Sequence, residues 1–196
     1  LEARLANEDV AWNAIEAIGD PARKLQNAAG LADLIVVSSR LGQDGRADAR
    51  RIVGALAGKS GRAILAVPPT TQGLNVAGQV LVAWDGSPEA NAALRTAIPL
   101  LRHAQQVTLL EVNLPDRAFA AEEAASYLSR HQIRAEVVER ITDGPISDII
   151  LAEAIRLKAA YIVMGAYGRG RAVDALFGGV SGGMLAKSEF PLLLRH

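Results

Sequence analysis

Residues 78–196 alternate between short apolar runs and longer stretches in which apolar side chains recur every three or four positions. The short runs are typical of buried strands of a parallel sheet, and the longer periodic stretches predict amphipathic helices. We expect strands at residues 80–84, 107–112, 133–141, 161–164 and 191–194, with helices at 87–101, 119–130 and 146–157 between them. Strands that alternate with helices favour right-handed βαβ crossovers. The expected fold class is therefore α/β, an open and doubly wound parallel sheet of the Rossmann-like type.

The first of these helices carries its own boundary signals. Ser87 is a favourable N-cap residue, and Pro88 suits the first helical position, where its missing N–H costs nothing. Pro99 lies near the other end and is expected to kink or end the helix in its last turn.

Segments of the first 70 residues resemble segments of the second half at a nearly constant spacing of 124 to 128 residues. The matching pairs are 31–37 with 158–164, 63–67 with 191–195, and 19–21 with 143–145. Such self-similarity predicts two copies of one α/β unit in tandem.

The two expected copies differ in completeness, because the first lacks the counterpart of residues 79–123. We expect a partial domain at residues 1–68, a linker at 69–77 and a complete domain at 78–196. The alternation of Val10, Trp12 and Ala14 predicts a strand in the first copy with one packed face. An incomplete copy leaves sheet edges uncovered, so either its beginning is truncated or a partner covers the gap.

Composition and charge exclude several classes of function. The 196 residues carry 21 Lys+Arg against 21 Asp+Glu, so no basic surplus exists for a nucleic-acid partner. The chain has no Cys, which excludes thiol catalysis and cysteine-ligated metal and fits a reducing, cytoplasmic setting. No apolar run approaches the roughly 18 residues of a membrane span, so no membrane partner is expected.

Small and polar residues follow the first and fourth strands of the complete copy. Open α/β sheets bind ligands at the carboxyl ends of their strands, near the point where strand order reverses. Asp85 follows the first strand, and Gly165, Gly168, Gly178 and Gly179 follow the fourth. Glycines let backbone N–H groups form an anion-binding nest, and a helix starting near Gly179 would add a dipole that favours phosphate.

The second copy resembles a domain of the universal stress protein family, and the whole chain resembles the family's tandem members. Nucleotide-binding members carry Gly-x2-Gly-x9-Gly-[Ser/Thr] after the fourth strand. Gly165, Gly168 and Gly178 match this spacing, whereas Gly179 stands where the family has Ser or Thr. In the first copy Ser38 and Leu41 replace the first two glycines, so the resemblance implies a degenerate site there.

The resemblance implies a set of nucleotide contacts along the second copy. Asp85 would receive the adenine or ribose end, Ala83 and Trp84 would lie beside it, and Val112 would flank the base. Met164, Gly165 and Gly168 would cradle the ribose and α-phosphate, and the outer phosphates would lie against Gly178, Gly179, Val180 and Ser181. The ligand implied is ATP or a related adenine nucleotide such as AMP or ADP, with Mg as a further cofactor.

The resemblance also implies a non-enzymatic role in the stress response, with at most slow ATP hydrolysis. Nucleotide occupancy would then alter assembly or contacts with partners. Domains of this family resemble dimers built through their last strand, so we expect a homodimer or an internal pseudo-dimer of the two copies.

Three other interpretations were weighed. A scaffold module of the same fold that never binds nucleotide is favoured by the missing hydroxyl at Gly179. Residues 179–183 match the Gly-x-Ser-x-Gly elbow of hydrolases, with Ser181 as nucleophile, but no Asp follows Ser181 in the chain. Gly58-Lys59-Ser60 resembles part of a phosphate-binding loop but follows a predicted helix, where a helix C-cap is the better interpretation. The three His residues are scattered and do not predict a metal site.

Overall fold

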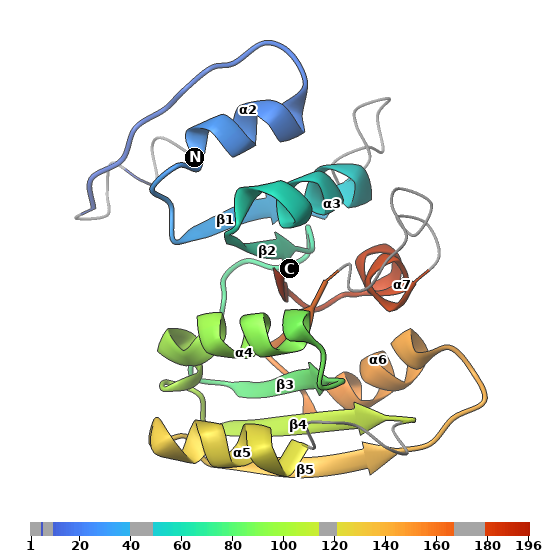
Figure 1. Ribbon diagram of the computed structural model, residues 1–196. Coiled ribbons are helices and arrows are strands. Elements are labelled where there is room, and N and C mark those ends of the chain that lie inside the picture. The colour runs from blue at the N-terminus through green and yellow to red at the C-terminus, as the bar shows by residue number, and fades with distance from the viewer. Residues whose placement is uncertain (1–4, 6–9, 40–48, 114–120, 167–178) are drawn as a thin grey trace.

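The computed structural model describes residues 5, 10–39, 49–113, 121–166 and 179–196. Seven strands form one sheet in the order β1-β2-β7-β6-β3-β4-β5, which runs from β1 near the top of Figure 1 to β5 at the bottom. The strands are β1 (Leu34–Ser38), β2 (Ala63–Val67), β3 (Gln79–Trp84), β4 (Gln106–Val112), β5 (Ala135–Arg140), β6 (Tyr161–Gly165) and β7 (Leu192–Arg195). The α/β fold with a mostly parallel sheet confirms the expected fold class.

Helices cover the sheet on both faces. They are α2 (Pro21–Ala28), α3 (Ala49–Ser60), α4 (Pro88–Leu101), α5 (Ala121–Arg130), α6 (Ile146–Leu157) and α7 (Val180–Lys187). Side chains of α4 and α5 share one hydrophobic cluster, and those of α2, α3, α6 and α7 share the other. Apolar side chains of the strands enter one cluster or the other, as expected for a sheet buried on both faces.

Local sequence signals explain where α4 begins but not where it ends. The Ser87 hydroxyl accepts a hydrogen bond from the Ala90 N–H at 3.1 Å, and Pro88 occupies the first turn. The helix continues through Pro99 to Leu101, beyond the point at which proline was expected to stop it. A proline in the last turn removes one helical N–H while the packed face of the helix is kept, since Ile98 and Leu101 are both buried.

The sheet is parallel except where β2 meets β7. Ile64 pairs with Leu194 and Ala66 pairs with Leu192 in an antiparallel ladder, which places Leu65 opposite Leu193 at its centre. Leu65 and Leu193 hold corresponding positions in the two similar segments 63–67 and 191–195. The two strands therefore meet around an approximate twofold axis that passes through this residue pair.

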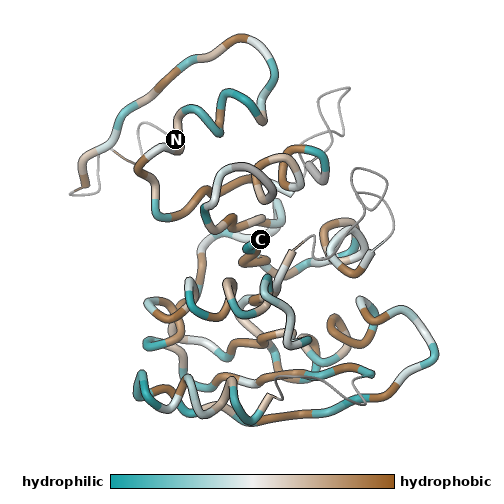
Figure 2. The backbone as a smooth tube through the Cα atoms, viewed as in Figure 1, coloured by the Kyte–Doolittle hydropathy of each residue, from teal (hydrophilic) through white to brown (hydrophobic). Residues whose placement is uncertain are grey.

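The prediction of a strand around Trp12 is wrong. Residues 11–18 form neither helix nor strand, and the side chains of Val10, Trp12 and Ile15 are 58%, 43% and 72% exposed. Figure 2 shows that hydrophobic and hydrophilic positions still alternate along this segment, at the top of the view before α2. An alternating segment forms a strand only where a neighbouring strand offers backbone partners, and in the described sheet β1 pairs with β2 alone.

The hydrophobic core is continuous across the sheet. One cluster unites Ile35 and Leu56 from the first 70 residues with Leu81, Ile162 and Met184 from the rest of the chain. Within the described ranges, no helix combines the length and apolar character that crossing a membrane requires.

Candidate functional site

The carboxyl ends of β3 and β6 lie side by side, because Ala83 pairs with Met164 in a parallel ladder. This register brings Asp85, just beyond β3, to the same edge of the sheet as Gly165, the last residue of β6. The order β6-β3-β4 also places the start of the chain's crossover connections here, which is where open α/β sheets bind ligands.

The turn after β3 presents an exposed carboxylate. Asp85 Oδ1 accepts a hydrogen bond from the Ser87 N–H at 3.0 Å, which fixes the side chain against its own turn. Gly86 has a φ of +68°, a conformation that side chains rarely adopt, and this permits the sharp passage from strand to helix. The turn therefore holds the Asp85 carboxylate at a defined position above the sheet edge.

Three of the predicted site residues share one face of the sheet. Ala83, Val112 and Met164 all pack in the cluster beneath α6 and α7, and Val112 and Met164 are 7% and 4% exposed. Trp84 packs in the cluster beneath α4 and α5 instead, because successive side chains of a strand point to opposite faces. Its indole therefore lies on the other side of the sheet from these three side chains.

Asn113 is a residue of this edge that sequence reasoning missed. Its φ of +56° turns the chain at the end of β4, and its amide group bonds the chain after β5 in both directions. Nδ2 donates to the Thr142 carbonyl at 2.5 Å, and Oδ1 accepts from the Thr142 N–H at 2.7 Å. The available signal was asparagine directly after a strand, since asparagine tolerates the left-handed region better than most residues.

Gly165 allows the end of β6 to approach the start of α4. A Cβ atom at this position would lie 2.7 Å from the Ala90 nitrogen and 2.9 Å from the Glu89 carbonyl carbon. Glycine is required here by packing against backbone, whatever ligand binds at the edge.

Glu89 is a second residue that the sequence did not single out. Its side chain is 12% exposed, Oε1 lies 4.0 Å from His196 Nδ1, and Oε2 is buried without a hydrogen-bond partner. This carboxylate adds a second acidic group near the edge where the chain leaves β3, β6 and β7.

The amino end of α7 supplies the predicted glycine-rich helix start. Gly179 is the N-cap, it makes no side-chain capping bond, and Val180 and Ser181 lie in the first turn. The first N–H groups of an α-helix have no acceptor within the helix, so they are suited to an anion. Gly168 and Gly178 lie outside the described residues. Among the residues that the structure describes, no three His, Asp or Glu side chains gather as a metal site would require.

The sequence profile of the Universal stress protein family matches residues 77–196, which is more than half of the chain. The chain belongs to the universal stress protein family. No curated protein sequence matches it.

Solved structures of longer proteins share the fold of this family member. A universal stress protein from Archaeoglobus fulgidus DSM 4304 matches with a TM-score of 0.71 and 19% identity, over 90% of this chain and 65% of that one. A putative universal stress protein from Pseudomonas aeruginosa UCBPP-PA14 matches with a TM-score of 0.63 and 17% identity, over 98% of this chain and 74% of that one. The chain thus spans less than two thirds of the length of the Archaeoglobus protein.

Proposed function

We propose that residues 78–196 bind ATP or a related adenine nucleotide, AMP or ADP, at the carboxyl edge of β3, β4 and β6. The observation that carries this proposal is one hydrophobic cluster that contains Val112, Met164 and the body of α7, with Ala83 and Val180 packed against it. The base-flanking side chains and the helix whose amino end receives phosphate therefore lie on the same side of the sheet. Trp84 contributes to this site through its backbone, next to the exposed Asp85.

The polar groups at the edge suit the two ends of a nucleotide. The Asp85 carboxylate is an acceptor for ribose hydroxyl or adenine amino hydrogens, while the N–H groups of Gly179, Val180 and Ser181 are donors for phosphate. Gly165, Gly168 and Gly178 complete the glycine spacing that the resemblance assigns to the ribose and phosphates. Mg²⁺ would enter bound to the phosphates and to water, since it is commonly held by one or two carboxylates together with substrate phosphates. Glu89, with its unpartnered buried oxygen, is the acidic group available for that hydrated ion.

We propose binding rather than turnover as the activity. Ser181 lies within the first turn of α7, whereas a hydrolase nucleophile sits on a sharp turn between a strand and a helix. Hydrolysis of ATP, if measured, is expected to be slow.

The assembly proposed is an internal pseudo-dimer, with residues 1–68 as a partial structural domain, 69–77 as a linker and 78–196 as the nucleotide-binding domain. The antiparallel pairing of β2 with β7 and the symmetric position of Leu65 and Leu193 support it. Nucleotide occupancy would bias this assembly, or the homodimer, toward contacts with partners. The absence of Cys supports a cytoplasmic setting.

Calorimetric titration of the chain with ATP, with and without Mg²⁺, tests the nucleotide proposal directly. Because a ligand that binds only the folded state stabilises it by RT ln(1+[L]/Kd), ATP at 100 times Kd should add about 2.7 kcal/mol to the free energy of unfolding. Asp85→Asn keeps the acceptor used by Ser87 and removes the charge, so it should weaken binding while leaving the fold intact. Asp143→Asn, at an exposed loop position, is the matched control. Absence of heat and of thermal stabilisation at hundreds of micromolar nucleotide would exclude the proposal.

The second candidate is a scaffold module that binds a protein and never a nucleotide. Gly179 favours it, because the helix start carries no hydroxyl where the family's motif has one. This alternative expects no stabilisation by ATP, together with retention of a specific partner in a pulldown with the chain as bait.

A further inference from the structure

A second pocket lies between α4 and α5, on the opposite face of the sheet from the candidate nucleotide site. Its volume is about 160 Å³. The wall from α4 consists of Asn91, Leu94 and Arg95, which recur at helical spacing and therefore share one face of that helix. Leu94 is 2% exposed, so the α4 wall is apolar at its base and polar toward solvent.

The wall from α5 repeats this division between base and mouth. Ala124 is 3% exposed at the base, and Tyr127 contributes an aromatic side. Glu123 and Arg130 are exposed residues that line the mouth. The Arg130 guanidinium carbon lies 5.6 Å from the centre of the Tyr127 ring, within the range of a cation–π contact.

Trp84 of β3 closes the pocket from the sheet side. The residue is 4% exposed, and its indole Nε1 is buried with no hydrogen-bond acceptor within reach. Buried donors without a partner are rare in folded proteins, and each one calls for an acceptor. Since the Trp84 ring lines the pocket, a molecule within it is placed to supply that acceptor.

The charges around the pocket select a singly charged anion. Arg95 and Arg130 bring two positive charges and Glu123 one negative charge, and among the described residues neither arginine forms an ion pair. Guanidinium groups favour carboxylate and phosphate oxygens. The Glu123 carboxylate at the same mouth disfavours a doubly charged phosphate, so a monocarboxylate is the better match.

The size and the walls fix the body of the ligand. A cavity of roughly 150 Å³ lined by apolar side chains accommodates a benzene ring. We propose that this pocket binds a small carboxylate with a ring-sized apolar body. The body packs against Leu94, Ala124 and the Tyr127 ring, and the carboxylate accepts hydrogen bonds from the Trp84 indole and the two guanidinium groups.

Benzoate is the probe for this site, read out by NMR of the indole N–H groups. The chain has two tryptophans, and Trp12 is 43% exposed and is not among the lining residues, so it serves as an internal control. Trp12→Phe assigns the two indole resonances. Titration with benzoate is expected to shift the Trp84 indole resonance in a saturable manner and to leave the Trp12 resonance in place. No saturable shift, or equal shifts of both resonances, would overturn the proposal.

Variants and competitors separate this pocket from other sites of binding. The double variant Arg95→Gln with Arg130→Gln should weaken benzoate binding by at least about tenfold, because charge-assisted hydrogen bonds are lost. Arg134→Gln, at an exposed position outside the pocket, should leave it unchanged. Benzamide has the shape of benzoate without its charge and should bind at least about tenfold more weakly. Equal weakening by Arg134→Gln, equal binding of benzamide, or displacement of benzoate by ATP would each contradict the assignment. Failure of ATP to bind would leave this proposal standing, since the two sites lie on opposite faces of the sheet.

Discussion

At the scale of the residue, two glycines of the predicted phosphate motif differ in what they do. Gly165 has backbone atoms of α4 within 3 Å of where a Cβ would stand, so its size is a requirement of packing. Gly179 has nothing within 4 Å of that point, and its φ of −108° is open to any residue. The sequence pattern could place both beside a ligand, but it could not separate these roles, because they depend on which backbone approaches each glycine.

Gly179→Ser restores the hydroxyl that the family motif carries and is therefore expected to strengthen ATP binding. One hydrogen bond to a charged oxygen contributes roughly 1.5–3 kcal/mol, or about tenfold or more in affinity. The same hydroxyl can cap α7, where Gly→Ser gains a few tenths of a kcal/mol. Calorimetry and thermal melting measure the two effects. Gly165→Ser is the contrasting variant and should destabilise the fold, and unchanged affinity in Gly179→Ser would show that phosphate does not reach the start of α7.

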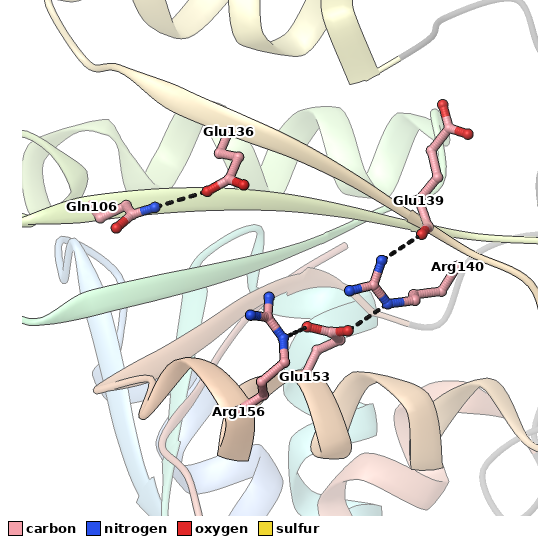
Figure 3. A network of polar contacts seen from close by, with 6 residues as sticks. All are labelled: Gln106, Glu136, Glu139, Arg140, Glu153 and Arg156. Atoms are coloured by element: carbon pink, nitrogen blue, oxygen red, sulfur yellow. Dashed lines mark hydrogen bonds and ion pairs between the residues drawn. The ribbon is translucent and has the colours of Figure 1, made fainter.

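Glu153 is a buried charge that the apolar stripe of α6 did not reveal. Figure 3 shows its carboxylate between two arginines, with Arg140 Nε 2.5 Å from Oε1 and Arg156 Nε 2.6 Å from Oε2. The Glu153 side chain is 8% exposed. Arg156 follows three residues later on the same helix, but Arg140 comes from β5, so only the fold could identify this partner. Burial raises the pKa of Glu153, and the hydrogen bonds from Arg156 and Arg140 outweigh burial and hold the pKa below its usual value of 4.5.

Glu153→Gln is expected to lower stability at pH 7 by about 1–2 kcal/mol. Removing one member of a buried ion pair is costly, but both arginines are partly exposed, which reduces the cost. Because the folded-state pKa is depressed, the stabilisation by the carboxylate is present above about pH 4.5 and is lost as pH falls through the lowered value. Urea unfolding at pH 7 and at pH 3 should therefore show the wild type and the variant converging in acid. Glu136→Gln, which removes only an exposed hydrogen bond with Gln106, is the control, and a gap that stays constant with pH would contradict the network's role.

At the scale of the element, hydrophobic periodicity located the strands well and failed where a strand lacks a neighbour. The predicted run at 63–67 coincides with β2, and the run at 80–84 differs from β3 by one residue. Residues 11–18 alternate in the same way and form no strand, since in the described chain no strand lies beside them. Periodicity reports which side chains suit a sheet face, whereas a strand also requires a partner for its backbone.

The edge strand β1 has an uncovered face, and Val36→Lys tests its consequence. Val36 is 59% exposed in a strand paired on one side only, and such edges template association between chains. Lysine at this position should lower self-association, measured by light scattering at high protein concentration, with little change in stability. Ile155→Lys replaces an apolar side chain of similar exposure on α6 and should leave association unchanged. Equal effects from both variants would point to general solubility instead of the edge.

At the scale of the whole molecule, the two similar segments share one sheet and one core. The repeat in the sequence predicted that residues 63–67 and 191–195 correspond, but it could not state that the two strands pair with each other. That pairing depends on the twofold relation between them, in which each strand covers the edge of the other. The proposed domains are therefore coupled through the β2–β7 ladder and through a cluster that contains Leu56 as well as Met184.

Residues 78–196 expressed alone should form a dimer through β7. Without β2, the apolar residues Leu192, Leu193 and Leu194, each at most 2% exposed in the intact chain, would border an open edge. A second β7 can replace β2 in the same antiparallel register, with Leu193 opposite its own copy where Leu65 stands in the intact chain, because the ladder is centred on this pair. Light scattering with size-exclusion chromatography should show the fragment as a dimer, and Leu193→Lys in the fragment should disfavour that dimer, because a charge blocks edge pairing. A stable monomeric fragment would show that β7 does not need a covering strand, and the pseudo-dimer would then lose its physical basis.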